Sequence, residues 1–560
     1  MKQSTFLRHP KFLLIWIIPL LILPTIFFIE GMIGKGAFVI LIMGAYWVTD
    51  VIPHAITSLI PLVLFPFFGI LSTEDTCHAY INDTLMIFMA SLMAAIAVEN
   101  SNLHNRISIK VLLLFGTSPK WLLLGFMMNT MFLSMWISNT ATTALMLPIV
   151  DAVLVQLRHK ARTNSDSSVR RVSIISSLDI NPPEIRRRSR SGSAIVIEED
   201  PEVDAKAFKT LRKALFLGIC YAANIGGIGT LTGTGPNLVL YGVLNENMQG
   251  IPNQITFASW MLFNVPVMLL LGFLAWLFIS IFYIQRALDS NEDNDKSRDR
   301  QITTLMRKKN QMMGRTTFQQ WTVLILFVSL IISWFFRNPN FLRGWSPMMV
   351  DRNKGDFIKD ATPAFLVVIL FFMIPSKPYD MSSTSALLDW PIVQEKFPWN
   401  VFILVGGGFA LAKGTQASGV SDWFSSQLMS MSSFPPIVLM LILCTIALVL
   451  TEISSNTATA MVLLPSIRDM AIGLGQSPVF YTLPTTLCCS FAFLLPIGSA
   501  TNALVFEAGE MKILDMFIPG LVMKSLCLLI LALMMNSWGY VVFGFHPVPS
   551  LKNSSIIIGT

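Results

Sequence analysis

Charged residues are scarce in this sequence. Asp, Glu, Lys and Arg make up 13% of its 560 residues, against about 25% in an ordinary soluble domain, while hydrophobic residues make up 53%. Several apolar runs approach or exceed the roughly 20 residues that a helix needs to cross a bilayer, among them 12–29, 36–52, 257–284 and 525–542. This composition excludes an ordinary soluble protein, and we expect an all-α polytopic membrane protein with about 11 spanning helices.

Cysteine and histidine are also rare, with six of each. Cys77 lies in a predicted loop, and the histidines form no cluster with acidic residues or cysteines. The spacings therefore give neither a disulfide framework nor a metal-binding motif. The apolar segments show no nucleophile with a base and no metal-ligand set, so the sequence does not support an enzyme. The other cysteines fall inside apolar runs: Cys220, Cys444, Cys488, Cys489 and Cys527.

The net charge of +7 does not indicate a nucleic-acid partner. Much of the basic excess lies in loops on one side of the expected topology, as the positive-inside rule requires of cytoplasmic loops. Lys2, Arg8 and Lys11 precede the first apolar run, and no small-residue cleavage site follows it. We therefore expect a retained first helix and a cytoplasmic N-terminus. Loop 337–360 is an exception to this rule. Successive spanning segments cross the membrane in alternate directions, which places the loop outside, although it carries five basic residues.

One short polar motif occurs twice in the apolar sequence. Ser-Asn-Thr at 138–140 recurs 317 positions later at 455–457, within the related stretches SNTATTALMLP and SNTATAMVLLP. The same offset relates residues 83–104 to residues 400–421. Small polar side chains inside apolar runs are unfavourable unless they bind a ligand or bond to backbone. The offset therefore predicts two structural repeats.

Each copy of the motif lies in the middle of a predicted helical hairpin. The run 121–157 contains Asp151 as its only charge and has basic residues on both flanks, which favours a re-entrant segment that returns to the face it left. Arms of about 17 residues, or about 25 Å of helix, would place 138–140 deep in the bilayer. One long helix or two fully spanning helices are the alternative. The second hairpin, 437–475, would enter from the opposite face, so that the repeats are inverted.

Two further apolar segments, 214–256 and 476–512, carry breaks that cannot be regular helix throughout. Glycine recurs in 226–237, and 495–502 contains both proline and glycine, which interrupt a helix. The breaks are 265 positions apart, which is fewer than the 317 positions between the two Ser-Asn-Thr motifs. A polar segment that follows the first motif and has no counterpart after the second accounts for the difference. In lipid, unwound backbone is tolerated only where it is buried in protein or lines a cavity. Each repeat therefore combines a hairpin with a broken transmembrane helix, and both breaks mark a site.

The polar segment 158–213 follows the first hairpin. It holds 13 basic and 8 acidic residues, a composition that cannot form a packed core, and we expect a disordered cytoplasmic linker. Ser173, Ser189 and Ser193 follow basic residues and are candidate phosphorylation sites. A solvated tether without regulation is the alternative.

The remaining segments predict a scaffold and the end of the chain. Three prolines between 53 and 71 predict a broken or kinked segment, and 72–82 is expected to be a loop. Asn553 in the tail is a candidate glycosylation site, whereas the sequon at Asn82 lies close to the next helix. The expected order is scaffold helices and the start of the first repeat (1–120), first hairpin (121–157), linker (158–213), broken helix (214–256), scaffold helices (257–436) with a cytoplasmic loop (285–316), second hairpin (437–475), second broken helix (476–512), and last helix with an extracellular tail (513–560).

The two motifs and the two breaks together suit an anion with a counter-cation. Helices that start beside each motif would direct backbone N–H groups and dipole-positive ends at the site, which attract anions. Carbonyl groups of the breaks, around 226–234 and 496–501, suit a hard cation that would offset the charge of a dianion. Hydrogen bonds to carboxylate oxygens would come from Ser138, Asn139, Thr140, Ser455, Asn456 and Thr457.

Two charged residues lie near these segments. Glu452 stands two positions before Ser454, and Lys413 follows three glycines. We expect Lys413 to pack or snorkel, with contact to substrate as the less favoured alternative. A single Ser-Asn-Thr would be interpreted as a helix cap, but two copies, each paired with a break, favour a binding site.

The sequence resembles the divalent anion/sodium symporters, whose animal members are the sodium-coupled di- and tricarboxylate transporters and the insect "I'm not dead yet" transporter. The resemblance covers nearly the whole membrane portion. It is carried by MWISNTATTALMLPIV at 135–150, TLTGTGPN at 230–237, GGGFALAKG at 406–414 and TEISSNTATA at 451–460. It implies a homodimer in membrane lipid, in which a scaffold domain holds a mobile transport domain built from both hairpins and both broken helices. Substrate would move by an elevator-like displacement.

The resemblance also implies the ligand sets. Both Ser-Asn-Thr tips would bind carboxylate, and each tip with its facing break would hold a sodium ion. Family members usually have Thr-Pro-Pro-Asn in the second break, but this chain has Ser-Ala-Thr-Asn at 499–502, which leaves the second cation site and the number of coupled ions open. The implied sodium ligands are Ser138, Asn139, Gly233 and Asn237 for the first ion, and Ser455, Asn456, Thr501 and Asn502 for the second.

These expectations define a secondary active transporter of di- and tricarboxylates, of the succinate and citrate class, with sodium as the co-transported ion and no other cofactor. The alternatives are a transporter of an inorganic anion such as sulfate and a sodium-independent carboxylate exchanger. A membrane receptor or scaffold that uses the linker for interactions is a more distant alternative. The resemblance and the two sequons favour the plasma membrane, with the C-terminus extracellular.

Overall fold

The computed structural model describes residues 10–29, 31–115, 118–154, 201–245, 255–285, 304, 307–308, 310–339, 344–349, 357–379, 385–421, 423 and 434–545. Within these residues the chain is helical and has no strand, and one isolated β-bridge joins Pro375 to Ala386. The candidate modification sites Ser173, Ser189, Ser193 and Asn553 lie outside the described residues.

The N-terminal part consists of short and long helices in succession. They are α1 (Pro10–Ile22), α2 (Pro24–Phe28), α3 (Gly31–Thr49), α4 (His54–Thr57), α5 (Ile60–Phe68), α6 (Thr73–Tyr80), α7 (Asp83–Asn100) and α8 (Leu103–Phe115). The predicted kink is confirmed, because α4 and α5 are separate helices. Pro53 precedes α4, and Pro61 lies in the first turn of α5, where a missing backbone N–H is tolerated.

The segment 72–82, predicted as a loop, is mostly helical as α6, so that prediction was wrong. The hydroxyl oxygen of Ser72 accepts a hydrogen bond from the backbone N–H of Asp75 at 3.0 Å and caps the helix. Glu74 and Asp75 lie in its first turn, where acidic side chains interact favourably with the helix dipole. A polar helix of 8 residues has no apolar periodicity to reveal it.

The central part contains the first hairpin and the first broken helix. Its elements are α9 (Pro119–Ser134), a helix over Asn139–Leu154, α11 (Pro201–Gly226), α12 (Gly235–Asn245), α13 (Phe257–Ile279) and the π-helical turn η2 (Ser280–Ile284) that continues α13. The two arms of the predicted hairpin and the break after Gly226 are therefore present as helices and interruptions.

Helix α11 begins at Pro201, inside the range 158–213 that was predicted as a disordered linker. The last part of that range is therefore helical, which corrects the prediction. The ammonium of Lys213 lies 2.7 Å from the carboxylate of Asp515, and a guanidinium nitrogen of Arg212 lies 2.6 Å from that of Glu510. These acids are about 300 residues further along the chain, so no local pattern indicated that the basic residues are neutralised.

The C-terminal part repeats the succession of a hairpin and a broken helix. Its elements are α16 (Phe318–Phe335), α17 (Ser346–Met349), α18 (Ala361–Met373), α19 (Trp390–Lys396), α20 (Trp399–Ala417), α22 (Pro436–Leu450), α23 (Asn456–Gly473), α24 (Pro478–Cys489), the 3-10 turn η5 (Pro496–Gly498), α25 (Ala500–Ala508), α26 (Ile513–Asn536) and α27 (Trp538–Phe543). The second break, predicted at 495–502, lies at 490–499, where it separates α24 from α25, so its last three predicted residues are helical.

Five helical stretches among the described residues are long and apolar enough to cross a membrane. Several of their apolar side chains are exposed, such as Trp321 and Ile325 on α16, as expected of a surface that faces lipid. The helices fit a polytopic membrane protein. The five stretches are Gly31–Thr49, Thr73–Asn100, Phe257–Ile284, Phe318–Phe335 and Ile513–Asn536.

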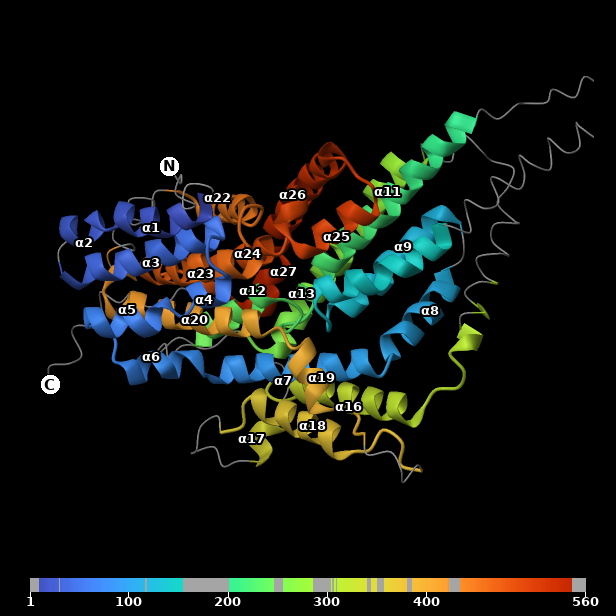
Figure 1. Cartoon of the computed structure of the whole chain (residues 1–560), viewed down its shortest axis with the longest axis horizontal. Helices are drawn as coiled ribbons and strands as arrows, with labels where there is room; N and C mark the ends of the chain where they lie inside the picture. Colours follow the sequence, from blue (N-terminus) through green and yellow to red (C-terminus); the bar gives the residue numbers. More distant parts are fainter. Residues whose placement is uncertain are drawn as a thin grey trace, which may run out of the picture.

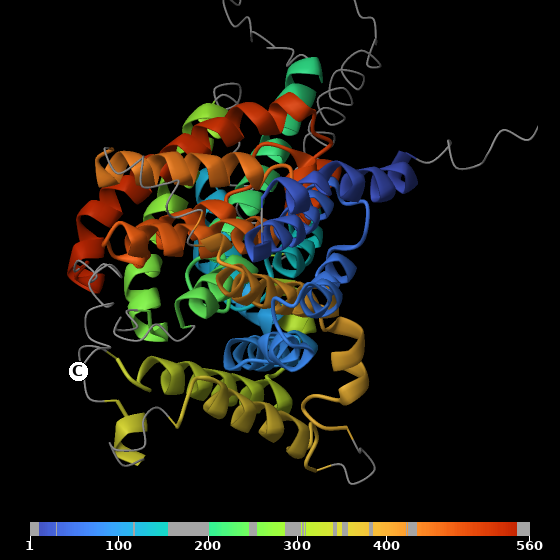
Figure 2. The same ribbon diagram turned by 90° about the vertical axis from the view of Figure 1, so that its left-hand side faces the viewer.

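The helices are arranged in two groups along the molecule. Helices α1, α3, α5 and α6 gather at one end with α20, whereas α9, α11 and α25 lie together toward the other end (Figure 1). Helices α16 and α18 form a layer beside α7 (Figures 1 and 2). In the interior, α12 packs against α23 and α24, and α11 packs against α25. Both broken helices are thus in contact with each other, although they come from different halves of the sequence.

Two basic residues of the exceptional loop 337–360 have acidic partners. Arg337 is buried and pairs with Asp360. The ammonium of Lys359 lies 3.2 Å from the carboxylate of Asp83. Two of the five basic residues of this loop are therefore held in ion pairs.

Candidate functional site

The first Ser-Asn-Thr motif forms the tip between α9 and the helix Asn139–Leu154. The hydroxyl oxygen of Ser138 accepts a hydrogen bond from the backbone N–H of Ala141 at 3.3 Å. The helix thus begins at the tip, with its unpaired N–H groups there, as predicted. Ser138 and Thr140 are exposed and Asn139 is half-buried, so a ligand can reach their polar atoms.

The second motif forms the equivalent tip between α22 and α23. Ser455 is the N-cap of α23, and its hydroxyl oxygen accepts a hydrogen bond from the backbone N–H of Ala458 at 3.2 Å. Ser455, Asn456 and Thr457 are all half-buried. The second tip therefore has the same local geometry as the first but is more enclosed.

The asparagine of each tip is held by a hydroxyl group five residues earlier. Ser134 Oγ lies 2.7 Å from Asn139 Oδ1 and 2.7 Å from the carbonyl oxygen of Ala223 on α11, and these two acceptors share its single hydrogen. In the same way, Asn456 Oδ1, at 2.9 Å, and the carbonyl oxygen of Cys489 at the end of α24 share the single hydrogen of Thr451 Oγ1. Each tip is thus joined to the broken helix of its own half.

Each break is closed by an asparagine at the start of the helix that follows. Asn237 Nδ2 donates to the carbonyl oxygens of Gly227 at 3.0 Å and Thr230 at 2.9 Å. In the second break, Asn502 Nδ2 donates to the carbonyl oxygens 265 positions after these two, at 3.0 and 2.9 Å. Both asparagines fix the unwound backbone into a compact loop, which orients the remaining carbonyl groups.

The side-chain oxygens of these two asparagines differ in their surroundings. Asn237 Oδ1 is buried and has no hydrogen-bond partner among the described residues. Asn502 Oδ1 accepts from Cys220 Sγ at 3.1 Å and from Asn224 Nδ2 at 3.5 Å. An unpartnered buried amide oxygen is unfavourable on its own and is a suitable ligand for a hard cation. The first break therefore fits a sodium ion better than the second does.

Close contacts bring residues of both halves together. A side chain at Gly227 would overlap the amide oxygen of Asn139, and one at Gly235 would overlap the hydroxyl of Thr457. Thr457 belongs to the second tip, whereas Gly235 begins α12 in the first half. Glycine at both positions lets the tips approach the backbone of α11 and α12, so the predicted site residues of the two halves converge in one region.

Sequence reasoning missed four residues of this region. Asn224 connects the two halves, since its amide accepts from Asn139 Nδ2 at 3.3 Å and donates to Asn502. Ser134 and Thr451 are separated by the same offset as the tips, so the repeat itself would have found them. Asn224 and Cys220 lie in the apolar part of α11, where the isolated asparagine was the available signal.

Lys413, one of the two charged candidates, forms an ion pair with a residue of α6. Its ammonium lies 3.5 Å from the carboxylate of Asp75 and 3.3 Å from the carbonyl oxygen of the same residue. This ion pair joins α20 to α6, which agrees with the preference for packing over substrate contact. Among the described residues there is also no group of three His, Cys, Asp or Glu that could hold a metal ion.

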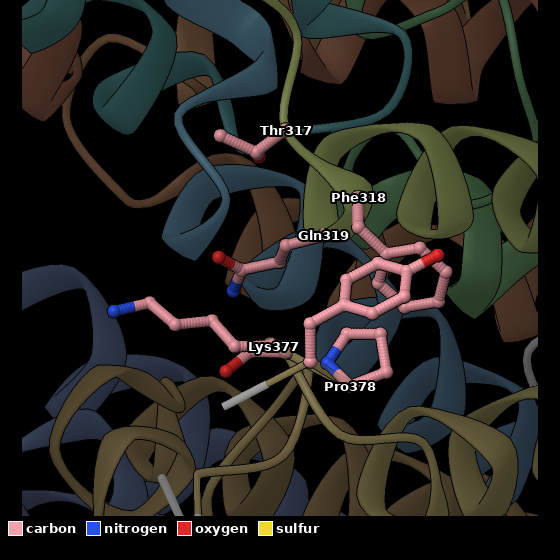
Figure 3. A pocket seen from close by; sticks show the side chains of 7 residues that line it. Thr317, Phe318, Gln319, Lys377 and Pro378 are labelled. Carbon is pink, nitrogen blue, oxygen red and sulfur yellow. The ribbon is translucent and has the colours of Figure 1, made fainter. Parts of the chain in front are cut away.

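A cavity of about 330 Å³ lies elsewhere, between the start of α16 and the chain that follows α18. Figure 3 shows Lys377 extending away from Phe318 and Pro378 on the wall of this cavity. Its lining residues are Thr317, Phe318, Gln319, Ser376, Lys377, Pro378 and Tyr379. None of them belongs to a tip or a break.

Comparisons with known proteins agree with this geometry. A family described as "Sodium:sulfate symporter transmembrane region" matches residues 8–545. The Na(+)/citrate cotransporter of Rattus norvegicus is 40% identical over 568 residues, covering 98% of this chain and 97% of the relative. Solute carrier family 13 member 2 of Homo sapiens is 37% identical (98% and 95% covered), and the Na(+)/dicarboxylate cotransporter 3 of Rattus norvegicus is 36% identical (97% and 94% covered).

Among solved structures, the fold is similar to that of Neisseria gonorrhoeae MtrF, which is described as illuminating a class of antimetabolite efflux pumps. That match has 13% sequence identity and a TM-score of 0.50, and it covers 86% of this chain and 84% of the other. It supports the helical membrane fold alone. The family match over nearly the whole sequence is more specific, and the relatives are named as transporters and not as enzymes. The chain therefore belongs to the sodium:sulfate, or divalent anion:sodium, symporter family.

Proposed function

We propose that this chain is a secondary active transporter that carries di- and tricarboxylates of the succinate and citrate class together with sodium. The relatives named above as Na+/citrate and Na+/dicarboxylate cotransporters support this substrate class. The observation that carries the proposal is the convergence of two Ser-Asn-Thr tips and two helix breaks in one region of the structure.

The chemistry of the tips suits a carboxylate. The helix Asn139–Leu154 and α23 both start at the site, so their N-terminal N–H groups and dipoles favour an anion. Ser138, Thr140 and Thr457 add hydroxyl groups that are exposed or half-buried. Asn139 and Asn456 use their amide oxygens to hold the tips in place, and each keeps N–H donor capacity for a substrate oxygen. A sodium ion bound beside the carboxylate would balance its charge, so the site does not need a buried Lys or Arg side chain.

The sodium ions are the second part of the proposal. The first ion lies between Ser138, Asn139, Gly233 and Asn237, where the free Oδ1 of Asn237 is available as a ligand. The second lies between Ser455, Asn456, Thr501 and Asn502, where Asn502 Oδ1 must exchange its present donors for the ion. Sodium is here a transported ion, and its binding neutralises part of the charge of the carboxylate.

The matching hydrogen bonds in the two halves support a repeated architecture, for which we propose inverted repeats with about 11 spans. Hydroxyl-to-asparagine bonds recur at an offset of 317 positions, and the bonds that close each break recur at 265. In this proposal, both hairpins re-enter the membrane from opposite faces and move with the broken helices as one body past a scaffold. The scaffold forms a homodimer in the plasma membrane, with the N-terminus cytoplasmic and the C-terminus extracellular.

The test is uptake of radiolabelled citrate and succinate by cells that express the chain, with sodium or choline as the external cation. The variant Asn139→Ala with Asn456→Ala removes both tip amides, and Asn536→Ala, an exposed asparagine near the end of α26, is the matched control. Sodium-dependent uptake that the double variant loses and the control keeps supports the proposal. Absence of carboxylate uptake by wild-type protein confirmed at the cell surface contradicts it.

The same assay separates the two alternatives. The family description names sulfate, so excess unlabelled sulfate is added as a competitor, and labelled sulfate is tested directly. Sulfate uptake without carboxylate uptake would assign the chain to the inorganic-anion branch. Carboxylate uptake that ignores sodium but is lost in the double variant would identify an exchanger.

A further inference from the structure

A buried ion pair lies directly behind the second tip. Glu452, between the end of α22 and the tip, is 4% exposed, and Lys524 on α26 is 5% exposed. The ammonium of Lys524 lies 2.6 Å from Glu452 Oε1 and also donates to the carbonyl oxygen of Leu448. Two charges inside an apolar segment are unfavourable unless they are paired and hydrogen-bonded, so this pair has a role that justifies its burial.

The carboxylate of Glu452 is bonded to the backbone of the second break. Its Oε1 accepts from the N–H groups of Phe493 at 2.8 Å and Leu494 at 3.0 Å, and its Oε2 accepts from the N–H group of Leu495 at 3.0 Å. The carbonyl of Leu495 is in turn one of the two that Asn502 binds. Glu452 and Asn502 therefore hold the same loop from two sides.

In the first half, uncharged groups surround the equivalent backbone of the break. The position equivalent to Glu452, at the offset of 317, is Met135. The N–H groups of Ile228 and Gly229 donate to backbone carbonyl groups three residues earlier, at 3.3 and 3.0 Å. Met135 and Met268 pack together where a side chain at Gly229 would lie. The carboxylate and the ammonium are therefore a feature of the second half alone.

The difference coincides with a difference in the breaks themselves. The first break has Pro236 immediately before Asn237, whereas the second has Thr501 before Asn502. Proline fixes its own backbone angle and restricts the residue before it. Without that restriction, the second loop needs another source of rigidity, and three hydrogen bonds to one carboxylate supply it, since bonds to a charged acceptor are stronger than those to a neutral one.

We infer that Glu452 is a positioning residue of the second cation site and that Lys524 is the counter-charge that allows it to be buried there. The carboxylate holds the N–H groups of 493–495 on one side, so that the carbonyl groups and Thr501 on the other side face the ion. The ammonium cancels the charge of the carboxylate, so the pair adds no net charge to the site. This inference rests on the proposed function, because it assumes that the ion is sodium.

The experiment is sodium-dependent citrate or succinate uptake by the full-length chain as a function of sodium concentration. Glu452→Gln keeps the shape but places an NH2 group against N–H donors or the ammonium. Glu452→Asp keeps the charge but is one methylene shorter and cannot reach all three N–H groups. Both are expected to raise the half-saturating sodium concentration about tenfold or more, with maximal uptake per surface molecule within about twofold of wild type. Met135→Leu, at the equivalent neutral position, is expected to leave it unchanged.

A second variant keeps the test valid if Glu452→Gln fails to fold. Glu452→Gln with Lys524→Met leaves no unpaired buried charge and is expected to fold, while it still lacks the carboxylate. A raised half-saturating sodium concentration in this double variant supports the inference. Wild-type sodium dependence in either the single or the double variant overturns it, because the pair would then be only a structural contact.

A binding measurement separates this inference from the proposed function. If wild-type protein shows no sodium-dependent carboxylate uptake, the proposed function fails. The thermal unfolding temperature of purified protein is then compared in sodium chloride and choline chloride. A sodium-induced increase that the double variant loses supports a cation site positioned by Glu452, and an equal increase, or none in wild type, overturns it.

Discussion

Arg337 holds three helices together, and its replacement by methionine is expected to destabilise the protein strongly. Its side chain is 10% exposed and that of its partner Asp360 is 3% exposed. Arg337 Nε pairs with the carboxylate of Asp360, Nη2 donates to the same group at 3.4 Å, and Nη1 donates to the carbonyl oxygen of Ile358 at 3.0 Å. The hydroxyl of Tyr241 donates to Asp360 Oδ2 at 3.0 Å. The cluster thus connects the end of α16, the start of α18 and α12.

The expected magnitude follows from burial. Arg337→Met leaves the carboxylate of Asp360 buried with Tyr241 as its remaining side-chain donor, and breaking a buried pair in this way costs about 3–5 kcal/mol. The pair between Lys413 and Asp75 is exposed, so its loss is expected to matter far less, because both charges stay in contact with water and are screened. Arg337→Met with Asp360→Leu removes both charges and is expected to recover most of the loss. Tyr241→Phe removes one hydrogen bond to a charged group, about 1.5–3 kcal/mol.

Thermal unfolding of the purified, detergent-solubilised protein measures this order. We expect Arg337→Met to unfold at the lowest temperature, the double variant and Tyr241→Phe at intermediate temperatures, and Lys413→Met, the control for an exposed pair, close to wild type. The reasoning is refuted if Arg337→Met unfolds at the same temperature as wild type. It is also refuted if the double variant is less stable than the single one, since the penalty could not then come from the unpaired carboxylate.

Three further predictions concern transport. Gly227→Ala is expected to reduce uptake at least tenfold, because its side chain would displace the Asn139 amide. The control is Gly44→Ala on α3, where nothing lies within 4 Å of the added atom. Normal uptake by Gly227→Ala would contradict the prediction and show that the tip can move aside. Trp260→Phe removes the buried hydrogen bond from Nε1 to the carbonyl oxygen of Ile228 at 3.0 Å, which contributes about 1 kcal/mol. This change is expected to raise the half-saturating sodium concentration several-fold. An unchanged concentration would mean that this bond does not fix the first break. Lys413→Met is expected to leave both carboxylate affinity and maximal uptake within about twofold of wild type, since its ion pair is exposed, and a large loss of affinity would instead indicate contact with substrate.

The repeated elements were predictable from the sequence because they depend on local chemistry. Apolar arms, a polar tip and a glycine-rich break are each visible in a short stretch, and the offset of 317 positions relates the two copies. The predicted hairpin 437–475 corresponds to α22 and α23, which together extend from Pro436 to Gly473. The caps formed by Ser138 and Ser455 were predicted for the same reason.

The features that were missed depend on contacts between distant parts of the chain. Helix α11 extends back to Pro201 beside acids about 300 residues away, and no local pattern identifies such partners. Glu452 was noticed in the sequence, but its partner Lys524 and the three N–H groups it binds were not. Helix α6 was missed because a short polar helix resembles a loop in composition.

The three amides that connect the halves have a consequence for how ions bind. Asn139 donates to Asn224, and Asn224 donates to Asn502, so each amide uses one end to accept and the other to donate. An ion that binds the oxygen of Asn502 must compete with the donor group of Asn224, and a rotation of Asn224 would release Asn139 at the opposite tip. We therefore expect the occupancy of one half to be coupled to the conformation of the other. We expect a sigmoidal response to sodium concentration, with a Hill coefficient that falls when Asn224 is replaced by leucine.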